Sequence, residues 1–391
     1  MRRTNQLAAA AAALTLVVGM GFGRFAFTGL YPLMVADGQI SLDGGSYAAS
    51  ANYAGYLIGA LLAGVLTRIS SRQLCAWASA TTIIMLGVLA LANPEWLIVA
   101  IRGLAGGASA VAMVAASHWL IHDRRHHHGA PTLFAGVGIG ILVSAEIIAA
   151  GHAAAISSRA NWLTLAIAAL VIGAIAVTIQ FRIDRTAPHD EPHDAPAAQQ
   201  PRAAAPPFGA ARLVVIYGLA GFGYIITATY LPLLVRSALG SLDPVHVWAI
   251  FGLGAAPSCF IWHALHHRWG TRASLMVNLA LQAIGVALPV LHSPVAYIGS
   301  ALLVGGTFMG TVTIVMPAAR RLAATQRFSM LAVLTAAYGV GQIIGPLIAS
   351  AIHGRTQSFD ASLGVAAIAL VVAASLCLGA NASRRPMAGS K

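Results

Sequence analysis

The strongest constraint on the fold of this chain is an internal repeat. Segments 21–34 and 221–234 are two copies of one pattern, and both read Gly-Phe-Gly in their first three positions and Pro-Leu in their twelfth and thirteenth. The same offset of 200 residues aligns Arg68 with Arg268, Arg72 with Arg272 and Pro94 with Pro294. Self-similarity that keeps its register over this length indicates a protein built as one half repeated twice.

The composition indicates that both halves lie in a membrane. Hydrophobic residues make up 58% of the chain and charged residues only 9%. A soluble domain of 391 residues could not bury that much apolar surface, because most of its own surface faces water. The net charge of +12 does not indicate nucleic-acid binding, since the basic residues form no cluster or stripe. The three cysteines lie in apolar stretches without metal-ligand spacing, which favours buried small side chains over a disulfide framework or a metal site.

Apolar runs of about 20 residues are long enough to cross the hydrocarbon core of a bilayer. The sequence predicts twelve such runs, six in each half, and therefore an all-α membrane protein of two pseudo-symmetric six-helix bundles. Segment 183–210 is rich in Pro, Ala, Asp and His, which is typical of a flexible linker, so we expect bundles at 1–182 and 211–391. The predicted spans are 8–35, 46–67, 74–92, 96–121, 131–152, 160–182, 211–237, 244–265, 273–291, 294–319, 328–352 and 359–380.

Arginine and lysine residues are distributed unevenly between the two sets of loops. The termini, the linker and the loops that follow even-numbered spans hold 18, whereas the opposite loops hold only Arg159, Arg236 and Arg355. This bias predicts a multi-pass protein of the bacterial inner membrane with both termini and the linker in the cytoplasm. The start at Arg2 resembles a signal peptide, but its apolar run continues into the repeated pattern, so we expect a first spanning helix rather than a cleaved leader.

Six phrases spread over both halves are similar to one known family: Gly-Phe-Gly-Arg-Phe-Ala (21–26), Ala-Ser-Ala-Asn-Tyr-Ala-Gly-Tyr (49–56), Phe-Ala-Gly-Val-Gly-Ile-Gly (134–140), Gly-Phe-Gly-Tyr-Ile-Ile (221–226), Val-Gly-Gly-Thr-Phe-Met-Gly (304–310) and Gly-Gln-Ile-Ile-Gly-Pro-Leu (341–347). Through them the whole chain resembles the major facilitator superfamily (MFS), and more narrowly its YbfB/YjiJ-type branch. The resemblance implies the MFS fold and a secondary transporter that works by alternating access, with its substrate site where the halves meet.

The chain departs from the superfamily pattern in the cytoplasmic loop after the second span. That loop usually reads Gly-x-x-x-Asp-Arg-x-Gly-Arg, but here Thr67 replaces the acid, and His267 stands at the same position of the second copy. The resemblance implies a cytoplasmic gate, weakened or rebuilt by this loss, at Arg68, Arg72, Arg268 and Arg272. The Gly-Pro pair that marks antiporters in span 5 is absent as well, so no motif fixes drug:proton antiport.

Three residues of fixed charge fall well within the predicted spans: Arg24, Arg102 and Glu146. An unpaired charge is costly inside a bilayer, so each is a candidate functional residue. Arg102 and Glu146 both lie roughly 9 Å below the outer surface, a depth at which they could pair. We expect Glu146 to bind a proton and to compete for Arg102 or Arg24, while the alternative is a static ion pair that fixes the packing of spans 4 and 5. Arg102 also lies in an Arg-x-x-x-Gly-x-x-x-Ala pattern that resembles the span-4 signature associated with proton transfer.

The second half has no such charges, since Tyr224 stands at the position of Arg24 and Leu302 at that of Arg102. Two arginines and one acid would leave a cavity between the halves positive, which favours an anionic group on the substrate. Polar and aromatic side chains of both halves are expected to bind the rest of the substrate, although each could equally be a hydrogen-bonding contact between helices. They are Asn52, Tyr53, Tyr56, Tyr224, Thr227, Tyr230, Thr307, Thr311, Tyr338 and Gln342.

Histidines near the cytoplasmic ends of the spans raise a different class of function. His118 and His122 are four residues apart, three more follow at 126–128, and another group lies at 263–267. These clusters resemble the histidine boxes of membrane di-iron oxidases and hydroxylases, because imidazoles at i and i+4 share one helix face and could chelate a metal. Such enzymes need few spans and no repeat, so we interpret the histidines as residues of loops and span ends.

The sequence as a whole predicts a secondary active transporter rather than an enzyme, because no Walker, nucleophile-elbow or HExxH motif is present. The expected partners are a small amphipathic or anionic organic molecule, protons and the lipid bilayer, with no cofactor, no metal and no nucleic acid, and the expected state is a monomer. Proton-coupled efflux is the first hypothesis. Proton-coupled import, a metal-dependent oxidase and a non-transporting receptor are the alternatives.

Overall fold

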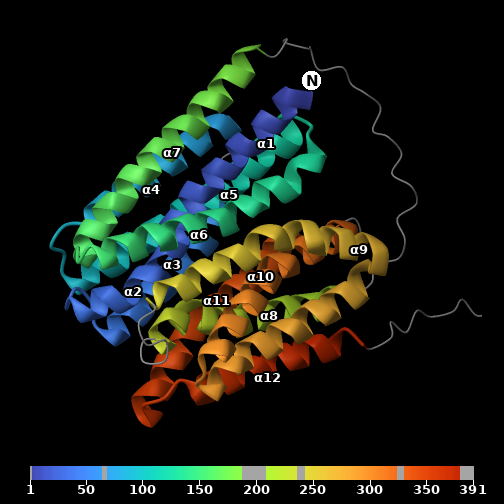
Figure 1. Ribbon diagram of the computed structural model, residues 1–391. Helices are drawn as coiled ribbons and strands as arrows, with labels where there is room; N and C mark the ends of the chain where they lie inside the picture. The colour runs from blue at the N-terminus through green and yellow to red at the C-terminus, as the bar shows by residue number, and fades with distance from the viewer. Residues whose placement is uncertain (1, 64–67, 187–207, 236–242, 324–329, 379–391) are drawn as a thin grey trace, which may run out of the picture.

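The computed structural model of the protein describes residues 2–63, 68–186, 208–235, 243–323 and 330–378 (Figure 1). Within these ranges the chain is helical and contains no β-strand, which confirms the expectation of an all-α protein. Thr67, Arg236 and most of the expected linker (187–207) lie outside the described residues.

The first half consists of seven α-helices and three short irregular helical segments within its described residues. Two of the short segments, η1 and η2, are π-helices, and η3 is a 3₁₀-helix. The elements are α1 (Arg2–Leu16), η1 (Val17–Phe25), α2 (Ala26–Ala36), α3 (Leu42–Ala63), α4 (Ser71–Leu89), α5 (Glu95–His118), η2 (Trp119–Asp123), η3 (His127–Gly129), α6 (Ala130–Ala153) and α7 (Ser158–Thr186). The first expected span is thus α1, η1 and α2 in continuous succession.

The second half repeats this sequence of helices with fewer irregular segments. Its elements are α8 (Ala210–Leu234), α9 (Val245–Ala287), η4 (Leu288–Leu291), α10 (Pro294–Ala323), α11 (Met330–Thr356) and α12 (Asp360–Leu376). The helices α7 and α8 border the segment that the sequence predicts as a linker, and α7 extends four residues into it, to Thr186. The boundaries of the two bundles stay a prediction.

Nine helices among the described residues are long and apolar enough to cross a membrane. The expected twelve spans are not reproduced one for one: α3 (expected span 2) is not among the nine, α9 contains expected spans 8 and 9 in 43 residues, and α12 has only 17 residues. Gly270 interrupts α9 with a φ of 74° and a ψ of 175°, a conformation that glycine adopts without steric cost. The chain turns back there, since the Ser274 hydroxyl donates a hydrogen bond to the carbonyl of Leu265.

Two groups of helices lie side by side in Figure 1, with α1–α7 drawn in blue to green and α8–α12 in yellow to red. Contacts between the groups come mainly from α6 with α9, α3 with α11 and α2 with α8. The Thr28 hydroxyl donates to the carbonyl of Ala228, a residue 200 positions later, over 3.0 Å. Residues related by a two-fold repeat can touch only near its axis. This contact therefore marks the line about which the two halves are arranged.

Helices α6 and α9 bring the two halves into close contact. A Cβ atom on Gly138 would lie 2.3 Å from the backbone nitrogen of Ala256, and one on Gly252 would lie 2.5 Å from that of Leu142. Side chains larger than hydrogen cannot fit at these two positions, which is the use that membrane helices make of small residues. The outer faces of the helices expose large apolar side chains, such as Trp96, as contact with lipid requires.

Candidate functional site

Arg24 occupies the middle of the molecule, at the C-terminal end of the π-helix η1. Only 4% of this residue is exposed. Its guanidinium carbon lies 4.1 Å from the ring centroid of Tyr56 and 4.9 Å from that of Tyr53, both on α3. The Nη2 atom donates to Oε1 of Gln342, on α11, over 2.9 Å. The arginine of the first half is thus held between aromatic rings of its own half and an amide of the other.

Gln342 joins repeat-related positions of the two halves. Its Nε2 atom donates to the hydroxyl of Tyr224, and its Oε1 atom accepts from Arg24. Tyr224 stands 200 positions after Arg24, so the two equivalent residues meet on one glutamine, as Thr28 and Ala228 meet directly. The sequence predicted all three as site residues, and the structure brings them together beside the axis of the repeat.

The charge of Arg24 is not balanced by an acid. Its Nε and Nη1 atoms are buried without a hydrogen-bond partner. No carboxylate within the described ranges forms an ion pair with it. A buried charged group with unsatisfied donors carries a desolvation penalty, which a bound anion would remove. The neighbouring aromatic faces supply only part of that compensation.

Arg102 lies close to Arg24 but has a different environment. It comes from α5, is 2% exposed, and donates from Nη1 to the carbonyl of Gly23 (2.7 Å) and from Nη2 to the carbonyl of Arg24 (2.8 Å). Asn52 donates in turn to the Arg102 carbonyl over 2.8 Å. Both acceptors of Arg102 belong to the π-helix, a backbone form that is rare and concentrated at functional sites. Arg102 therefore fixes the segment that carries Arg24.

The expected pairing of Glu146 with Arg102 is wrong. The segment η1 contacts both α5 and α6, which barely touch each other, so the two side chains lie on opposite sides of the first span. The partner of Glu146 is His246 on α9, with 3.2 Å between Oε1 and Nδ1, and the Glu146 side chain is 51% exposed. Counting residues from the end of each span gave the depth of Arg102 and Glu146 in the membrane. It did not give the direction in which each side chain points around its helix.

A second pair of an acid and a histidine lies beside Glu146 and His246, but here the histidine belongs to the first half and the acid to the second. His152 of α6 contacts Asp243, which precedes α9. Each pair therefore joins an acid and a histidine from different halves, at the end of the molecule opposite the N-terminus. These contacts lie at the rim of the close α6–α9 interface, away from the contacts of Arg24.

The remaining predicted lining residues do not form one group. Tyr338 stacks on Tyr224, with 5.8 Å between ring centroids, and so belongs with Arg24. The hydroxyl of Tyr53 bonds that of Thr229 across the halves (3.2 Å). Others bond elsewhere: Tyr230 to Ser46 and the Pro346 carbonyl, Thr307 to the Leu303 carbonyl and Thr311 to Asn278. Thr227 is buried, and its hydroxyl has no partner.

Sequence reasoning missed four aromatic residues that pack together next to the site: Phe25, whose ring lies against Arg24, and Trp248, Phe251 and Phe308 of the second half. Phe25 packs against Phe308 at 5.9 Å between centroids, and its carbonyl accepts a hydrogen bond from Trp248 Nε1 over 3.0 Å. In an apolar span, such residues carry no signal that separates lipid contact from site contact. The spacing of Trp248 and Phe251, three residues apart, placed them on one helix face but did not say which way that face points.

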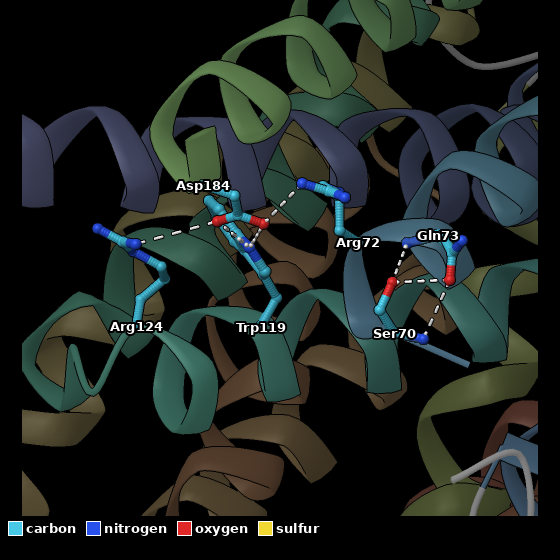
Figure 2. A network of polar contacts seen from close by, with 6 residues as sticks. All are labelled: Ser70, Arg72, Gln73, Trp119, Arg124 and Asp184. Atoms are coloured by element: carbon cyan, nitrogen blue, oxygen red, sulfur yellow. Dashed lines mark hydrogen bonds and ion pairs between the residues drawn. The ribbon is translucent and has the colours of Figure 1, made fainter. Parts of the chain in front are cut away.

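Arg72, one of the residues expected to form a gate, contacts an acid of α7 (Figure 2). Asp184 lies 3.4 Å from Arg72 Nη1 and 3.9 Å from Arg124 Nη1, and it accepts a hydrogen bond from Trp119 Nε1 over 3.2 Å. Ser70, beside this network, caps α4 together with Gln73. All of these contacts lie within the first half. Asp184 thus gives Arg72 the acidic partner that the loop itself lacks at Thr67.

In the second copy of the gate motif, Arg272 stands at the position of Arg72 and Arg268 at that of Arg68. Arg272 lies 5.6 Å from the ring centroid of Phe208, and Arg268 is exposed, as is Arg68 in the first half. The histidines of both regions form contacts of their own, such as His118 with Asp123 at 3.1 Å and the ring of His263 against that of His267. No group of three or more His, Cys, Asp or Glu among the described residues is placed to hold a metal ion.

Comparison with known proteins agrees with this architecture. Residues 16–378 match the family described as "Uncharacterised MFS-type transporter YbfB". No curated protein matches the chain. The structure is similar to a crystal structure of a mutant of the nucleoside transporter NupG, with a TM-score of 0.69 and 15% identity, over 95% of this chain and 98% of that one. At this identity the likeness shows the fold, which is the MFS fold. The chain is therefore a multi-pass membrane protein that belongs to the YbfB family of MFS-type transporters.

Proposed function

We propose that this transporter moves a small organic anion across the inner membrane by alternating access, and that Arg24 binds the anionic group. The observation that carries this proposal is the buried guanidinium of Arg24, which has two nitrogens without partners and no acid beside it among the described residues. A carboxylate is the complement of this group in charge and in hydrogen bonding.

The position of Arg24 suits alternating access. Its contact with Gln342 crosses from the first half to the second, beside the axis of the repeat. When the halves separate on either side, this contact breaks, and a carboxylate oxygen of the substrate can take the place of Gln342 Oε1 on Arg24. The site is then open to one side of the membrane at a time, as in transporters built from two repeats.

We also propose that the proton gradient drives transport, with Glu146 as the proton-binding group. Its partner in this scheme is His246 of the other half, in place of Arg102. Protonation of Glu146 removes the charge that attracts His246 and weakens a contact between the halves at the end opposite the N-terminus. The pair of His152 with Asp243 is a second contact between an acid and a histidine of different halves at the same rim. In this scheme Arg24 binds no proton, and it takes part in coupling only by holding the anionic substrate.

Binding of anions tests the role of Arg24. We expect small monocarboxylates to raise the melting temperature of the purified wild-type protein and their neutral amides to have no effect, and we expect Arg24→Gln to abolish the stabilisation. Arg159→Gln, which changes an exposed arginine in the first turn of α7, is the matched control and should behave as wild type. Equal stabilisation by acids and amides, or an undiminished effect in Arg24→Gln, would contradict the proposal.

Transport in proteoliposomes tests the direction. A stabilising acid is supplied on one side under an imposed pH gradient, and its accumulation is followed with either side acidic. Accumulation in the acidic compartment indicates exchange against protons and hence efflux from the cytoplasm, whereas accumulation in the alkaline compartment indicates symport and hence import. Equal accumulation of the acid with either side acidic would contradict proton coupling.

A further inference from the structure

Six aromatic rings form a continuous stack in the second half, next to Arg24. Neighbouring rings have centroids 4.4 to 5.8 Å apart, and their planes lie within 36° of each other. In order, the rings are Trp248, Phe251, Phe308, Tyr224, Tyr338 and Tyr217. They come from α8, α9, α10 and α11, and only the pair of Trp248 and Phe251 joins neighbours on one helix, so the stack is built mainly by tertiary packing.

The stack lies at the boundary between the halves. Phe25 of the first half packs its ring edge-on against Phe308, with an angle of 72° between the planes. The neighbour of Phe25 in sequence is Arg24, whose partner Gln342 bonds Tyr224 within the stack. One glutamine therefore separates the cation from the aromatic faces. The rings fill the space beside Arg24 while the halves are closed together.

Because the rings of the stack are nearly parallel, separation of the two halves would expose flat aromatic faces. A stack of planar faces that is opened by movement of one helix leaves a slot that a flat ring can enter with its own faces against those of the protein. Ring pairs of this kind contribute beyond the burial of apolar area. A saturated ring of the same size is thicker and has no π-face, so it gains the burial without the stacking.

We infer that the substrate is an aromatic carboxylate, with its carboxylate on Arg24 and its ring against Tyr224 and Phe308. The inference rests on the proposed function, which supplies the anionic group, and adds the chemical class of the body attached to it. The Tyr53 and Tyr56 rings stay on the guanidinium of Arg24 and exclude water from the ion pair. Arg24 thus selects for charge, and the stack selects for planarity.

Pairs of acids with the same charge but a planar or a saturated ring distinguish selection for charge from selection for planarity. The probes are benzoate with cyclohexanecarboxylate, and 2-naphthoate with its fully saturated counterpart, and binding to the full-length protein is measured by calorimetry. We expect the aromatic member of at least one pair to bind about tenfold more tightly than the saturated member, since two ring contacts are formed. A site that is merely apolar predicts the reverse order, because the saturated rings are the more hydrophobic.

Two leucine variants test whether the preference for aromatic over saturated acids comes from the stack. Phe308→Leu keeps an apolar side chain but removes the ring between Tyr224 and Phe251, and it should bring the ratio of the two affinities close to one. Phe260→Leu changes a phenylalanine of α9 that is 48% exposed, and it should keep the wild-type ratio. Melting temperatures without ligand show whether each variant is folded.

The outcomes distinguish this inference from the function on which it rests. If the aromatic and saturated acids bind equally and Arg24→Gln abolishes both, the aromatic class is wrong and the anion site stands. If Phe308→Leu, folded, keeps the full preference for aromatic acids, the stack is not the selecting element and the inference is overturned. If no acid of either pair binds, or binding is independent of Arg24, the inference and the anion site both fail.

Discussion

The surroundings of Arg24 and of Arg102 differ in one respect that separates a binding group from a structural one. Both arginines are nearly fully buried; Arg24 belongs to the π-helix η1, and Arg102 of α5 donates to its backbone. Arg102 donates to two backbone carbonyls from both of its terminal nitrogens and has only its Nε without a partner, whereas Arg24 has one side-chain acceptor and two nitrogens without partners, Nε and Nη1. A buried charge that the protein satisfies by itself holds structure together. One that it leaves unsatisfied is available to a ligand.

The largest expected effect is on the stability of Arg102→Met. This change removes two charge-assisted hydrogen bonds, worth about 1.5–3 kcal/mol each, and leaves the buried carbonyls of Gly23 and Arg24 without their donors. The melting temperature in detergent should therefore fall by many degrees. A fall no larger than that of an exposed control such as Arg159→Met would remove the distinction between the two arginines.

The matched variant Arg24→Met should act in the opposite way. Replacement of a poorly satisfied buried charge by an apolar side chain of similar volume is often neutral or stabilising by about 1–4 kcal/mol. We therefore expect the melting temperature to stay or to rise, while transport of every anionic substrate is lost. Loss of fold in Arg24→Met, comparable to that of Arg102→Met, would show that both arginines are structural.

A smaller effect is expected at Gln342, the acceptor that occupies Arg24 in the closed structure. Gln342→Leu removes this competitor, so anions that stabilise the wild type should bind roughly fivefold more tightly, in line with the loss of one hydrogen bond of about 1 kcal/mol. The control is Gln180→Leu, a buried glutamine of α7 that bonds Thr15 and should leave affinity unchanged. Weaker binding in Gln342→Leu would mean that the glutamine contacts the ligand instead of competing with it.

The smallest effect on stability is expected for Glu146→Gln. The pair with His246 is about half exposed, so its contribution to folding should stay below about 1 kcal/mol. Its effect should appear instead in the pH dependence of transport, measured in proteoliposomes over pH 5 to 8. If the pH profile of Glu146→Gln matches that of wild type, the coupling assigned to this residue is wrong.

The sequence was most informative where a residue type is unusual in its surroundings. Arg24 and Arg102 stand out in apolar spans, and the offset of the repeat brought Tyr224 into register with Arg24. The pairing of Arg102 with Glu146 failed because the depth of a residue along a helix says nothing of its direction around that helix. The division of α9 was predicted, since expected spans 244–265 and 273–291 lie on either side of the turn at Gly270. The count of twelve is not reproduced within the described residues, because α3 and α12 are not among the nine helices that are long and apolar enough to cross a membrane.

By itself, the sequence determined that the chain is an all-α membrane protein of repeated halves, because hydropathy and the offset of 200 residues are properties of the order of residues alone. It also singled out the few charges that fall within the predicted spans. Only the tertiary structure decided which of those charges are satisfied, since that depends on the carbonyls, amides and rings that other helices bring within contact. Arg102 meets the backbone of η1, Glu146 meets a histidine of the other half, and Arg24 meets a glutamine of the other half and aromatic rings of its own, with no counter-charge among the described residues.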